Sequence, residues 1–169
     1  MPRFDRRDFL GASAGLAAGL FVSGSTARAA EGADRPVRLA VMGLGGRGRS
    51  LASTFGKQKG VVIAGVCDTD RNHLAVGATE VGKATGSDPK AETDIRKLLD
   101  DKSIDAVVCA APNHWHAPAT ILACAAGKHV YVEKPCSHNP AEGEMMIAAA
   151  LKHDRCVQVG TQRRSHAAS

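Results

Sequence analysis

The sequence predicts an α/β protein with a doubly wound parallel sheet, covered by helices on both faces. Apolar runs of strand length alternate along the chain with segments of helical spacing, and the strand-like runs are largely apolar throughout. Such strands need helices against both faces of the sheet, and parallel neighbours need crossover connections, which are right-handed. With 169 residues, of which 44% are hydrophobic, the chain can bury one sizeable core.

The expected strands are the apolar runs themselves. Each is four to seven residues long and rich in Val or Ala, and most are followed directly by Gly, Pro or Asp. The expected strands are residues 37–42, 61–67, 105–111, 129–132 and 156–159.

The expected helices lie between these strands, and residues typical of helix ends mark several of them. Thr93 or Asp94 can cap a short helix, Gly127 ends another, and Pro140 stands in a first turn. A loop with Gly, Ser, Asp and Pro is expected over residues 82–90. The expected helices are residues 71–81, a short one through 99, 118–126 and 140–153, besides the helix that follows the first strand.

The glycine-rich turn after the first strand carries the strongest functional signal. Gly43, Gly45 and Gly48 form G-x-G-x-x-G, the pattern by which a strand brings a dinucleotide pyrophosphate to a helix N-terminus. Gly43 is expected to make the tight turn and Gly48 to let the helix pack on the strand. Gly45 is expected to let the backbone approach the phosphates, so a Cβ there should block them. Gly46 and Arg47 complete the turn and are candidate cofactor contacts.

The end of the second strand supports this hypothesis. Asp68 lies 20 residues after Gly48, where an acidic residue can bind the ribose hydroxyls of a dinucleotide. Its carboxylate would repel a 2′-phosphate, which favours NAD over NADP, although Arg71 is close enough in sequence to weaken that preference. The alternative is a glycine-rich turn followed by an unrelated strand, and the order and spacing of the two elements disfavour it.

Polar segments follow the other strands as well. In a doubly wound sheet, ligands bind beyond the carboxyl ends of the strands, so these segments are candidate parts of the same site. They are residues 112–116 with the sequence P-N-H-W-H, residues 133–135 with E-K-P, and residues 160–165 with G-T-Q-R-R-S.

As a set, these motifs resemble the N-terminal domain of the Gfo/Idh/MocA family, the relatives of glucose-fructose oxidoreductase and inositol dehydrogenase. The resemblance covers about residues 36–165 and implies a Rossmann-like fold with NAD lying across the strand ends. The motifs that carry it are Gly43-x-Gly45-x-x-Gly48, Asp68, Pro112-Asn113-x-x-His116 and Glu133-Lys134-Pro135.

The resemblance also implies roles for the polar segments. Pro112 and Asn113 would contact the ribose and adenine side of the cofactor, and Glu133 would contact the nicotinamide ribose. Gln162 is a candidate nicotinamide contact. His116 is expected to contact the cofactor loop or to cap the following helix.

Lys134 is the expected catalytic residue, because the resemblance places it beside the nicotinamide. An ammonium held there can polarise or deprotonate the hydroxyl group whose carbon gives up hydride. Pro135 would fix the chain, with a cis peptide bond as one possibility, so that the lysine points into the cleft. The alternative is a surface lysine before a turn proline.

Two neighbouring features leave alternatives or exclude a site. Trp115 can pack over the cleft or stack on a sugar. His114 and His116 form H-x-H, but no carboxylate or cysteine nearby completes a set of ligands, so no metal site is expected.

The resemblance implies an oxidoreductase that transfers hydride between a sugar or polyol and a nicotinamide cofactor. An NAD-dependent glycoside hydrolase with a transient redox cycle is the alternative enzyme, and a non-catalytic dinucleotide-binding module is the alternative of another class. The E-K-P segment resembles the dehydrogenases more than the NAD-dependent glycosidases of the family.

The family has a second, C-terminal α/β domain that supplies further substrate-binding groups. Because the sequence stops at Ser169, we expect a truncated chain in which residues 166–169 begin the connection to that domain. Such a chain is expected to bind dinucleotide weakly without turning over substrate, and the full-length form is expected to be a homo-oligomer.

The N-terminus predicts export. Arg6 and Arg7 precede a weakly apolar run over residues 11–22, and Ala27 and Ala29 provide a cleavage site for a signal peptidase. We expect a twin-arginine signal peptide over 1–29, with the export machinery as a partner, and a periplasmic location for the mature chain. This route carries folded proteins, so the cofactor can travel with the protein. An uncleaved anchor is the alternative. Residues 30–35 are expected to be a linker before the 36–165 domain.

Charge and cysteine content limit the other classes. The formal net charge is +5, and it falls to +3 without residues 1–29, which hold four basic and two acidic residues. The basic residues are scattered, and with one Trp, one Tyr and four Phe no aromatic series is present for base stacking, so no nucleic-acid partner is expected. The five cysteines are expected to be reduced, and three of them, Cys67, Cys109 and Cys156, to behave as small hydrophobic residues in strands.

Overall fold

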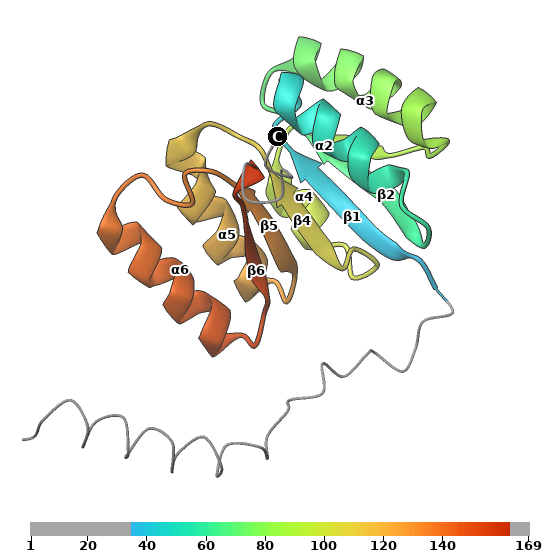
Figure 1. The fold of residues 1–169 in the computed structure, drawn as a ribbon. Coiled ribbons are helices and arrows are strands. Elements are labelled where there is room, and N and C mark those ends of the chain that lie inside the picture. Colours follow the sequence, from blue (N-terminus) through green and yellow to red (C-terminus); the bar gives the residue numbers. More distant parts are fainter. Residues whose placement is uncertain (1–34, 163–169) are drawn as a thin grey trace, which may run out of the picture. The chain divides into compact units, whose positions relative to one another are not determined.

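A computed structural model of the chain describes residues 35–162, and they alternate between strand and helix as the sequence predicts (Figure 1). The strands are β1 (Val37–Met42), β2 (Val61–Cys67), β3 (Lys90–Glu92), β4 (Ala106–Cys109), β5 (His129–Glu133) and β6 (Val157–Gly160). The helices are α2 (Gly46–Gly56), α3 (Arg71–Thr85), α4 (Ile95–Leu99), the 3-10 helix η1 (Asn113–Trp115), α5 (His116–Ala125) and α6 (Pro140–Lys152).

The six strands form one sheet in the order β3-β2-β1-β4-β5-β6, and every neighbouring pair is parallel. The chain builds outward from β1 to one edge and then returns to β4 to build toward the other edge. The reversal lies between β1 and β4, and the loops after these strands diverge there. In sheets of this order, ligands bind in the crevice at that reversal.

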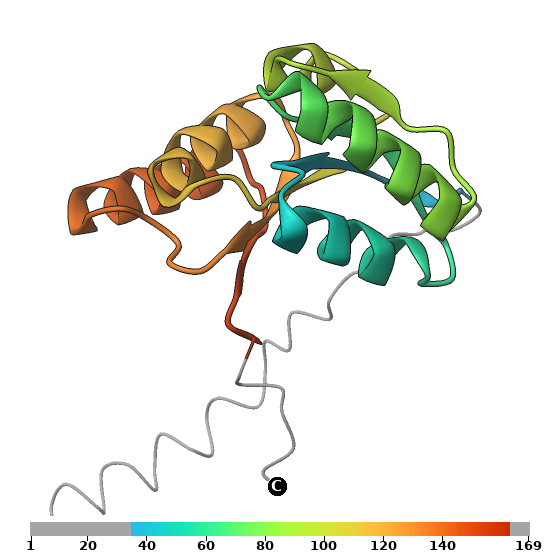
Figure 2. The same ribbon diagram turned by 90° about the horizontal axis from the view of Figure 1, so that it is seen from above.

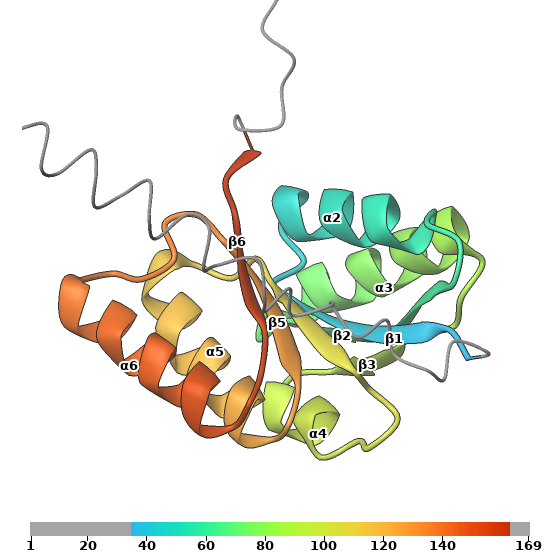
Figure 3. The same ribbon diagram turned by 60° about the horizontal axis from the view of Figure 1, so that its bottom comes forward.

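Helices cover both faces of the sheet (Figures 2 and 3). The alternating side chains of β1 show why both faces are apolar: Leu39 and Val41 belong to the cluster beneath α2 and α3, whereas Ala40 and Met42 belong to the cluster beneath α4, α5 and α6. This arrangement confirms the predicted doubly wound α/β fold, with its core divided between two layers of helices.

Several helix ends agree with the predicted cap residues. Asp94 is the N-cap of α4, and its side chain accepts a hydrogen bond from the Arg96 N–H at 3.0 Å. Pro140 stands in the first turn of α6 as predicted, and Asn139, which was not predicted as a cap, caps this helix through its side chain. Gly127, which follows α5, has a φ of +78°, a left-handed conformation that favours glycine.

Some predicted boundaries were wrong. α3 continues to Thr85, so the first part of the predicted loop over 82–90 is helical, and Gly86, with a φ of +66°, closes the helix. β3 was not predicted, and β4 ends two residues earlier than expected. β3 has only three residues, too few to show a hydrophobic period, and it is a strand because it pairs with the end of β2.

All five cysteines have free thiols, but only some lie in the core. Cys67 and Cys109 are buried, and this burial raises the pKa of the Cys67 thiol to about 12 and that of Cys109 to about 11. The prediction for Cys156 was wrong, because this residue precedes the edge strand β6 and is exposed.

The predicted signal peptide, residues 1–29, and most of the predicted linker lie outside the described residues. Within residues 35–162, no helix has both the length and the apolar character needed to cross a membrane.

Candidate dinucleotide site

The glycine-rich turn joins β1 to α2, and its glycines differ in what surrounds them. Gly43 has a φ of +87°, and a Cβ there would lie 2.6 Å from the Ala111 nitrogen. A Cβ at Gly48 would lie 1.7 Å from the carbonyl oxygen of Gly43. These two positions therefore require glycine for the turn and for the close approach of the helix, as predicted.

Gly45 and Gly46 face open space. A Cβ at either position would have no atom of residues 35–162 within 4 Å. The fold itself therefore does not require glycine at Gly45, whereas a group bound against the turn would occupy the volume that a Cβ would fill.

The start of α2 is suited to an anion. The N-cap is Gly45, so no side chain caps the helix among the described residues, and the first turn contains no acidic residue. The N–H groups of a first helical turn have no partner within their own helix and carry partial positive charge. They provide a phosphate site beside the open face of the turn.

Asp68 connects the end of β2 to the glycine-rich turn. Its Oδ2 accepts a hydrogen bond from the Leu44 N–H at 2.7 Å, and its Oδ1 accepts one from the Asp70 N–H at 2.9 Å. A carboxylate has about four acceptor positions, so two are left unused by the described residues and could accept from ribose hydroxyls. The predicted contact with the ribose is compatible with this geometry.

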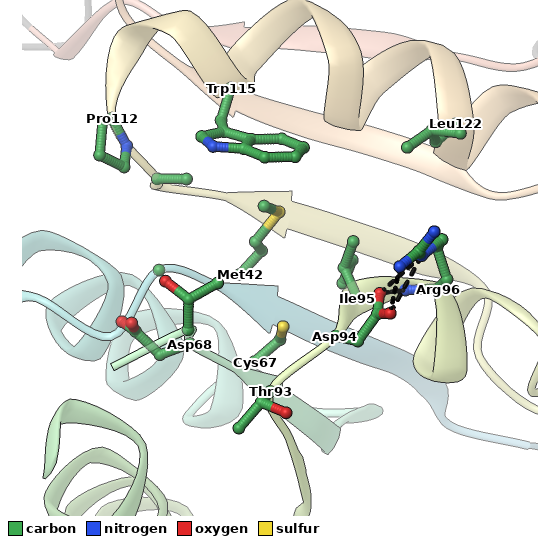
Figure 4. Close-up of a pocket in the computed structure, with 13 residues that line it drawn as sticks. Met42, Cys67, Asp68, Thr93, Asp94, Ile95, Arg96, Pro112, Trp115 and Leu122 are labelled. Carbon is green, nitrogen blue, oxygen red and sulfur yellow. Dashed lines mark hydrogen bonds and ion pairs between the residues drawn. The ribbon is translucent and has the colours of Figure 1, made fainter. Parts of the chain in front are cut away.

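A pocket of about 420 Å³ opens beside Asp68 at the reversal of the strand order (Figure 4). Pro112 and Trp115, which follow β4, line its opposite side, and Met42 lies between the two sides. The Trp115 indole covers the pocket while 41% of the residue stays exposed. Apolar walls beside an acceptor carboxylate suit a flat, weakly polar ring attached to a group with hydroxyls.

The part of this pocket that follows β3 was not predicted from the sequence. Thr93, Asp94 and Ile95 line it, and the Arg96 guanidinium donates to Asp94 Oδ2 at 2.6 Å (Figure 4). This contact lowers the pKa of Asp94 to about 2. The rule that ligands bind beyond the strand ends would have indicated these residues, had the short strand before them been predicted.

Glu133 lies at the centre of the other side of the site. It ends β5, and 6% of its side chain is exposed. Arg47 of α2 donates to Oε1 from Nε at 2.8 Å and approaches it with Nη2 at 2.7 Å. Gln162 Nε2 donates to Oε2 at 3.1 Å, and the Lys134 N–H donates to the same oxygen at 3.3 Å. The structure therefore brings together four of the predicted site residues.

Lys134 lies on the exposed edge of this group. Lys134 is exposed, and the peptide bond to Pro135 is cis, as its sequence allowed. Asn113 is also exposed, at the start of η1. The predicted cofactor contact of Asn113 and the catalytic role of Lys134 stay predictions.

His116 lies under the loops rather than on their surface, since 1% of the residue is exposed. Its Nδ1 is 2.5 Å from the Pro135 carbonyl oxygen, and its Nε2 is 2.9 Å from the Ala111 carbonyl oxygen. Both ring nitrogens therefore contact the backbone, one after β5 and one after β4. His116 supports two loops of the site from below.

No cluster of three or more His, Cys, Asp and Glu side chains that could hold a metal ion occurs in residues 35–162. The site instead consists of a pocket on one side, the open start of α2, and the group around Glu133. This combination, on a parallel sheet of this strand order, defines a dinucleotide-binding Rossmann domain.

Comparison with protein families identifies the domain further. Residues 37–161 match the family described as the GFO_IDH_MocA oxidoreductase family with an NAD-binding Rossmann fold. The chain belongs to the Gfo/Idh/MocA oxidoreductase family, as its motifs indicate, and residues 37–161 are the NAD-binding Rossmann domain of that family.

Curated relatives carry the name glycosyl hydrolase family 109 protein. The protein from Saccharopolyspora erythraea is 32% identical over 92% of this chain and 39% of its own length. The protein from Solibacter usitatus is 31% identical over 94% of this chain and also 39% of its own length. The chain thus spans about two fifths of the length of these relatives.

Solved structures with the same fold include dehydrogenases. The myo-inositol 2-dehydrogenase of Lactobacillus plantarum is 30% identical, with a TM-score of 0.68 over 78% of this chain and 38% of its own. The WlbA dehydrogenase of Chromobacterium violaceum, crystallised with NADH and UDP-GlcNAcA, is 26% identical, with a TM-score of 0.70 over 78% of this chain and 37% of its own.

Proposed function

We propose that this NAD-binding domain serves an oxidoreductase that acts on a sugar or polyol. The observation that carries the proposal is the arrangement of the site on both sides of the strand reversal: Asp68 and its pocket lie on one side, and Glu133 with Lys134 lies on the other. The open start of α2 lies between them. The dehydrogenases among the similar structures, one for an inositol and one crystallised with a nucleotide sugar, support the substrate class.

The described residues fit the parts of NAD. The pocket beside Asp68 would hold the adenosine, with the carboxylate accepting from ribose hydroxyls. The uncapped N–H groups of α2 and the space at Gly45 would hold the diphosphate. The group around Glu133 would adjoin the nicotinamide ribose. When bound, the nicotinamide supplies the exchange of hydride.

Among the residues of this chain, Lys134 is the one that we expect to contact the substrate. Its ammonium belongs to an exposed residue directly after Glu133, at the edge where the strands end. An ammonium at that edge can donate a hydrogen bond to a substrate hydroxyl, and its conjugate amine can accept the proton of that hydroxyl. Pro135, held from below through its carbonyl oxygen by His116, fixes the backbone on the other side of Lys134.

Glycoside cleavage through a transient oxidation is the second candidate. The names of the curated relatives favour it. In this scheme the substrate is oxidised, loses its aglycone by elimination, adds water and is reduced again. The cofactor therefore returns to its starting state in each cycle, and both candidates use the same domain.

The first experiment tests the cofactor. The purified 169-residue chain is denatured, and any released dinucleotide is identified by mass spectrometry; chain without bound dinucleotide is titrated with NAD. Bound NAD or saturable binding is expected. Absence of both would contradict the proposal.

The second experiment separates the two reactions, on the full product of the reading frame. Incubation with NAD and a panel of polyols or sugars is followed at the absorbance of reduced nicotinamide, and incubation with aryl glycosides is followed by release of the aglycone. Net formation of NADH supports the oxidoreductase. Release of aglycone without net NADH supports the glycosidase and contradicts the first candidate.

We also propose that residues 1–29 direct export by the twin-arginine route. The paired Arg6 and Arg7, the weakly apolar run and the small residues up to Ala29 support it. Replacing both arginines by lysine is expected to keep the chain in the cytoplasm, and the exported wild-type chain is expected to begin at Ala30. Export of the double variant at the wild-type level would contradict this proposal.

A further inference from the structure

The Glu133 carboxylate is already engaged by three residues. Arg47 donates a hydrogen bond to Oε1 from Nε and forms an ion pair with the same oxygen through Nη2, and Gln162 and the Lys134 backbone each donate to Oε2. An ionised carboxylate has about four acceptor positions, so three hydrogen bonds and an ion pair occupy most of them. A ribose hydroxyl that binds Glu133 must compete with these donors.

Arg47, in contrast, retains unused donors within the part of the chain that the structure describes. A guanidinium has five N–H groups, and only its Nε and Nη2 contact Glu133, so both N–H groups of Nη1 have no partner among residues 35–162. The Arg47 side chain is 41% exposed, and the residue belongs to the first turn of α2, beside the open space at Gly45 and Gly46. The remaining N–H groups are therefore available close to the place that suits a diphosphate.

The position of Glu133 is built into the sheet. Gly160 pairs with Glu133 between β5 and β6, and a Cβ at Gly160 would lie 2.5 Å from the Tyr131 hydroxyl and 3.1 Å from Glu133 Oε1. A larger residue at Gly160 would displace the carboxylate that holds Arg47. A buried carboxylate with fixed donors is a firm anchor for a guanidinium.

We propose that Glu133 acts on the cofactor through Arg47, by orienting the guanidinium toward the diphosphate. Arg47 contacts the diphosphate directly, and Glu133 is a positioning residue for it. The inference rests on the proposed binding of NAD by this domain. It differs from the expectation that Glu133 binds the nicotinamide ribose, because it places the effect of Glu133 on a part of NAD that ADP also contains.

The physical advantage is preorganisation. A free arginine side chain loses conformational entropy when it binds a phosphate, whereas a guanidinium already held by a carboxylate has lost most of that freedom. The helix N-terminus and the guanidinium then act on the same anion. Loss of either member of the pair should weaken binding of a diphosphate and leave binding of adenosine unchanged.

The chain offers a matched control on the same helix. Arg49 lies two residues further along α2 and pairs with Glu80 of α3 at 2.7 Å. This pair joins the two helices on the surface and includes none of the proposed cofactor contacts. Arg49→Gln therefore removes a comparable ion pair and one positive charge from the same helix.

The test measures the affinity of the chain for adenosine, ADP and NAD by calorimetry. The proteins are the wild type, Arg47→Gln, Glu133→Gln, the double variant and the Arg49→Gln control. Arg47→Gln and Glu133→Gln are each expected to weaken ADP and NAD by about tenfold and to leave adenosine unchanged. The double variant is expected to be no weaker than Arg47→Gln alone, because Glu133 acts through Arg47. Arg49→Gln is expected to match the wild type.

Three outcomes would overturn the inference. Weaker NAD with unchanged ADP in Glu133→Gln would place the effect of Glu133 on the nicotinamide ribose. Unchanged ADP in Arg47→Gln would remove Arg47 from the diphosphate site. A wild-type chain that binds none of the three ligands would contradict the proposed function as well.

If Glu133→Gln misfolds, it will also lose its affinity for adenosine. A second variant, Arg47→Lys, therefore tests the inference without changing Glu133. Arg47→Lys keeps the charge but lacks the planar fork that can hold a carboxylate and a phosphate together. Its affinity for ADP is expected to lie between those of Arg47→Gln and the wild type. Wild-type affinity in Arg47→Lys would show that charge alone suffices and would contradict the role of the Glu133 contact.

Discussion

At the scale of single residues, the glycine-rich turn separates what the fold requires from what a ligand requires. Gly43 and Gly48 have backbone atoms where a Cβ would stand, whereas Gly45 has none. The sequence motif is the same for all three positions, and only the coordinates separate them. The difference leads to a pair of substitutions with opposite effects.

Gly48→Ala is expected to destabilise the fold, and Gly45→Ala is expected to impair only binding. The clash at Gly48 should lower the free energy of unfolding by about 2 kcal/mol or more. Gly45→Ala should leave the free energy of unfolding within about 0.5 kcal/mol of the wild type while NAD binding is lost. Urea unfolding and NAD titration measure the two effects. Normal NAD affinity in Gly45→Ala would show that no ligand group occupies that space.

The thiols provide a second prediction at this scale. Burial raises the pKa of Cys67 to about 12 and that of Cys109 to about 11, so at pH 8 both are protonated and shielded. Cys156 is exposed and Cys136 is partly buried. With Ellman's reagent at pH 8, we expect Cys156 to react first, Cys136 more slowly, and the other three only after unfolding. Cys156→Ser should remove the fast phase, and its persistence would show that another thiol is accessible.

At the scale of elements, the sequence predicted the helices and strands that have a clear pattern of their own residues. The strands with continuous apolar runs, which are all except β3, and the helices with clear caps were found within a few residues of their predicted positions. β3 could not be predicted because its pairing with Gly65–Cys67 of β2, rather than its composition, makes it a strand. The pocket residues Thr93 and Asp94 were missed with it.

The pairing of Arg47 with Glu133 shows the same limit. The two residues are 86 positions apart, and no local pattern links them. The motifs indicated both as cofactor contacts, but the three hydrogen bonds to the carboxylate depend on how β5, β6 and α2 meet. Such a contact is a property of packed elements and leaves no periodic signal in the sequence.

Asp105, which precedes β4, joins the start of β1 to β4 and gives a prediction for pH. Its carboxylate accepts from Arg35 at 2.6 and 2.9 Å and from the Arg38 N–H at 2.8 Å. The hydrogen bonds from the Arg35 guanidinium lower the pKa of Asp105. Since the folded state then binds the proton less tightly than the unfolded state, this contact stabilises the fold above pH 4 and is lost as the pH falls through the lowered pKa.

Asp105→Asn is therefore expected to lower the free energy of unfolding by roughly 1 kcal/mol at pH 7 and by less at pH 2 to 3. Urea unfolding between pH 2 and 7 measures this difference. Asp88→Asn, at an exposed loop position, is the matched control and should follow the wild type. An equal loss at both ends of the pH range would show that the ionised form of Asp105 does not stabilise the fold.

At the scale of the whole domain, the candidate cofactor site spans both halves of the sheet. The pocket beside Asp68 belongs to the β1–β3 half on one side and to the loop after β4 on the other. A ligand that contacts both halves of the native state and not the unfolded chain raises the stability of the domain as a unit.

NAD is accordingly expected to raise the unfolding temperature of the chain. At 100 times its dissociation constant, the gain is about 2.7 kcal/mol. NADP should give a smaller shift, because the Asp68 carboxylate would repel a 2′-phosphate. Asp68→Asn should reduce the NAD shift and narrow the difference between the two cofactors, whereas Asp100→Asn at the end of α4 should change neither. Equal shifts with NAD and NADP in the wild type would contradict the role of Asp68.

The imidazole of His116 makes two stretches of chain depend on each other's length. It contacts the carbonyl oxygen of Ala111, five residues earlier, and that of Pro135, 19 residues later. An inserted or deleted residue before His116 would rotate the ring away from Pro135 and release the segment that presents Lys134. We therefore expect natural variation in this domain to change loop sizes elsewhere, such as between α3 and β3, before it changes the spacing of P-N-x-x-H.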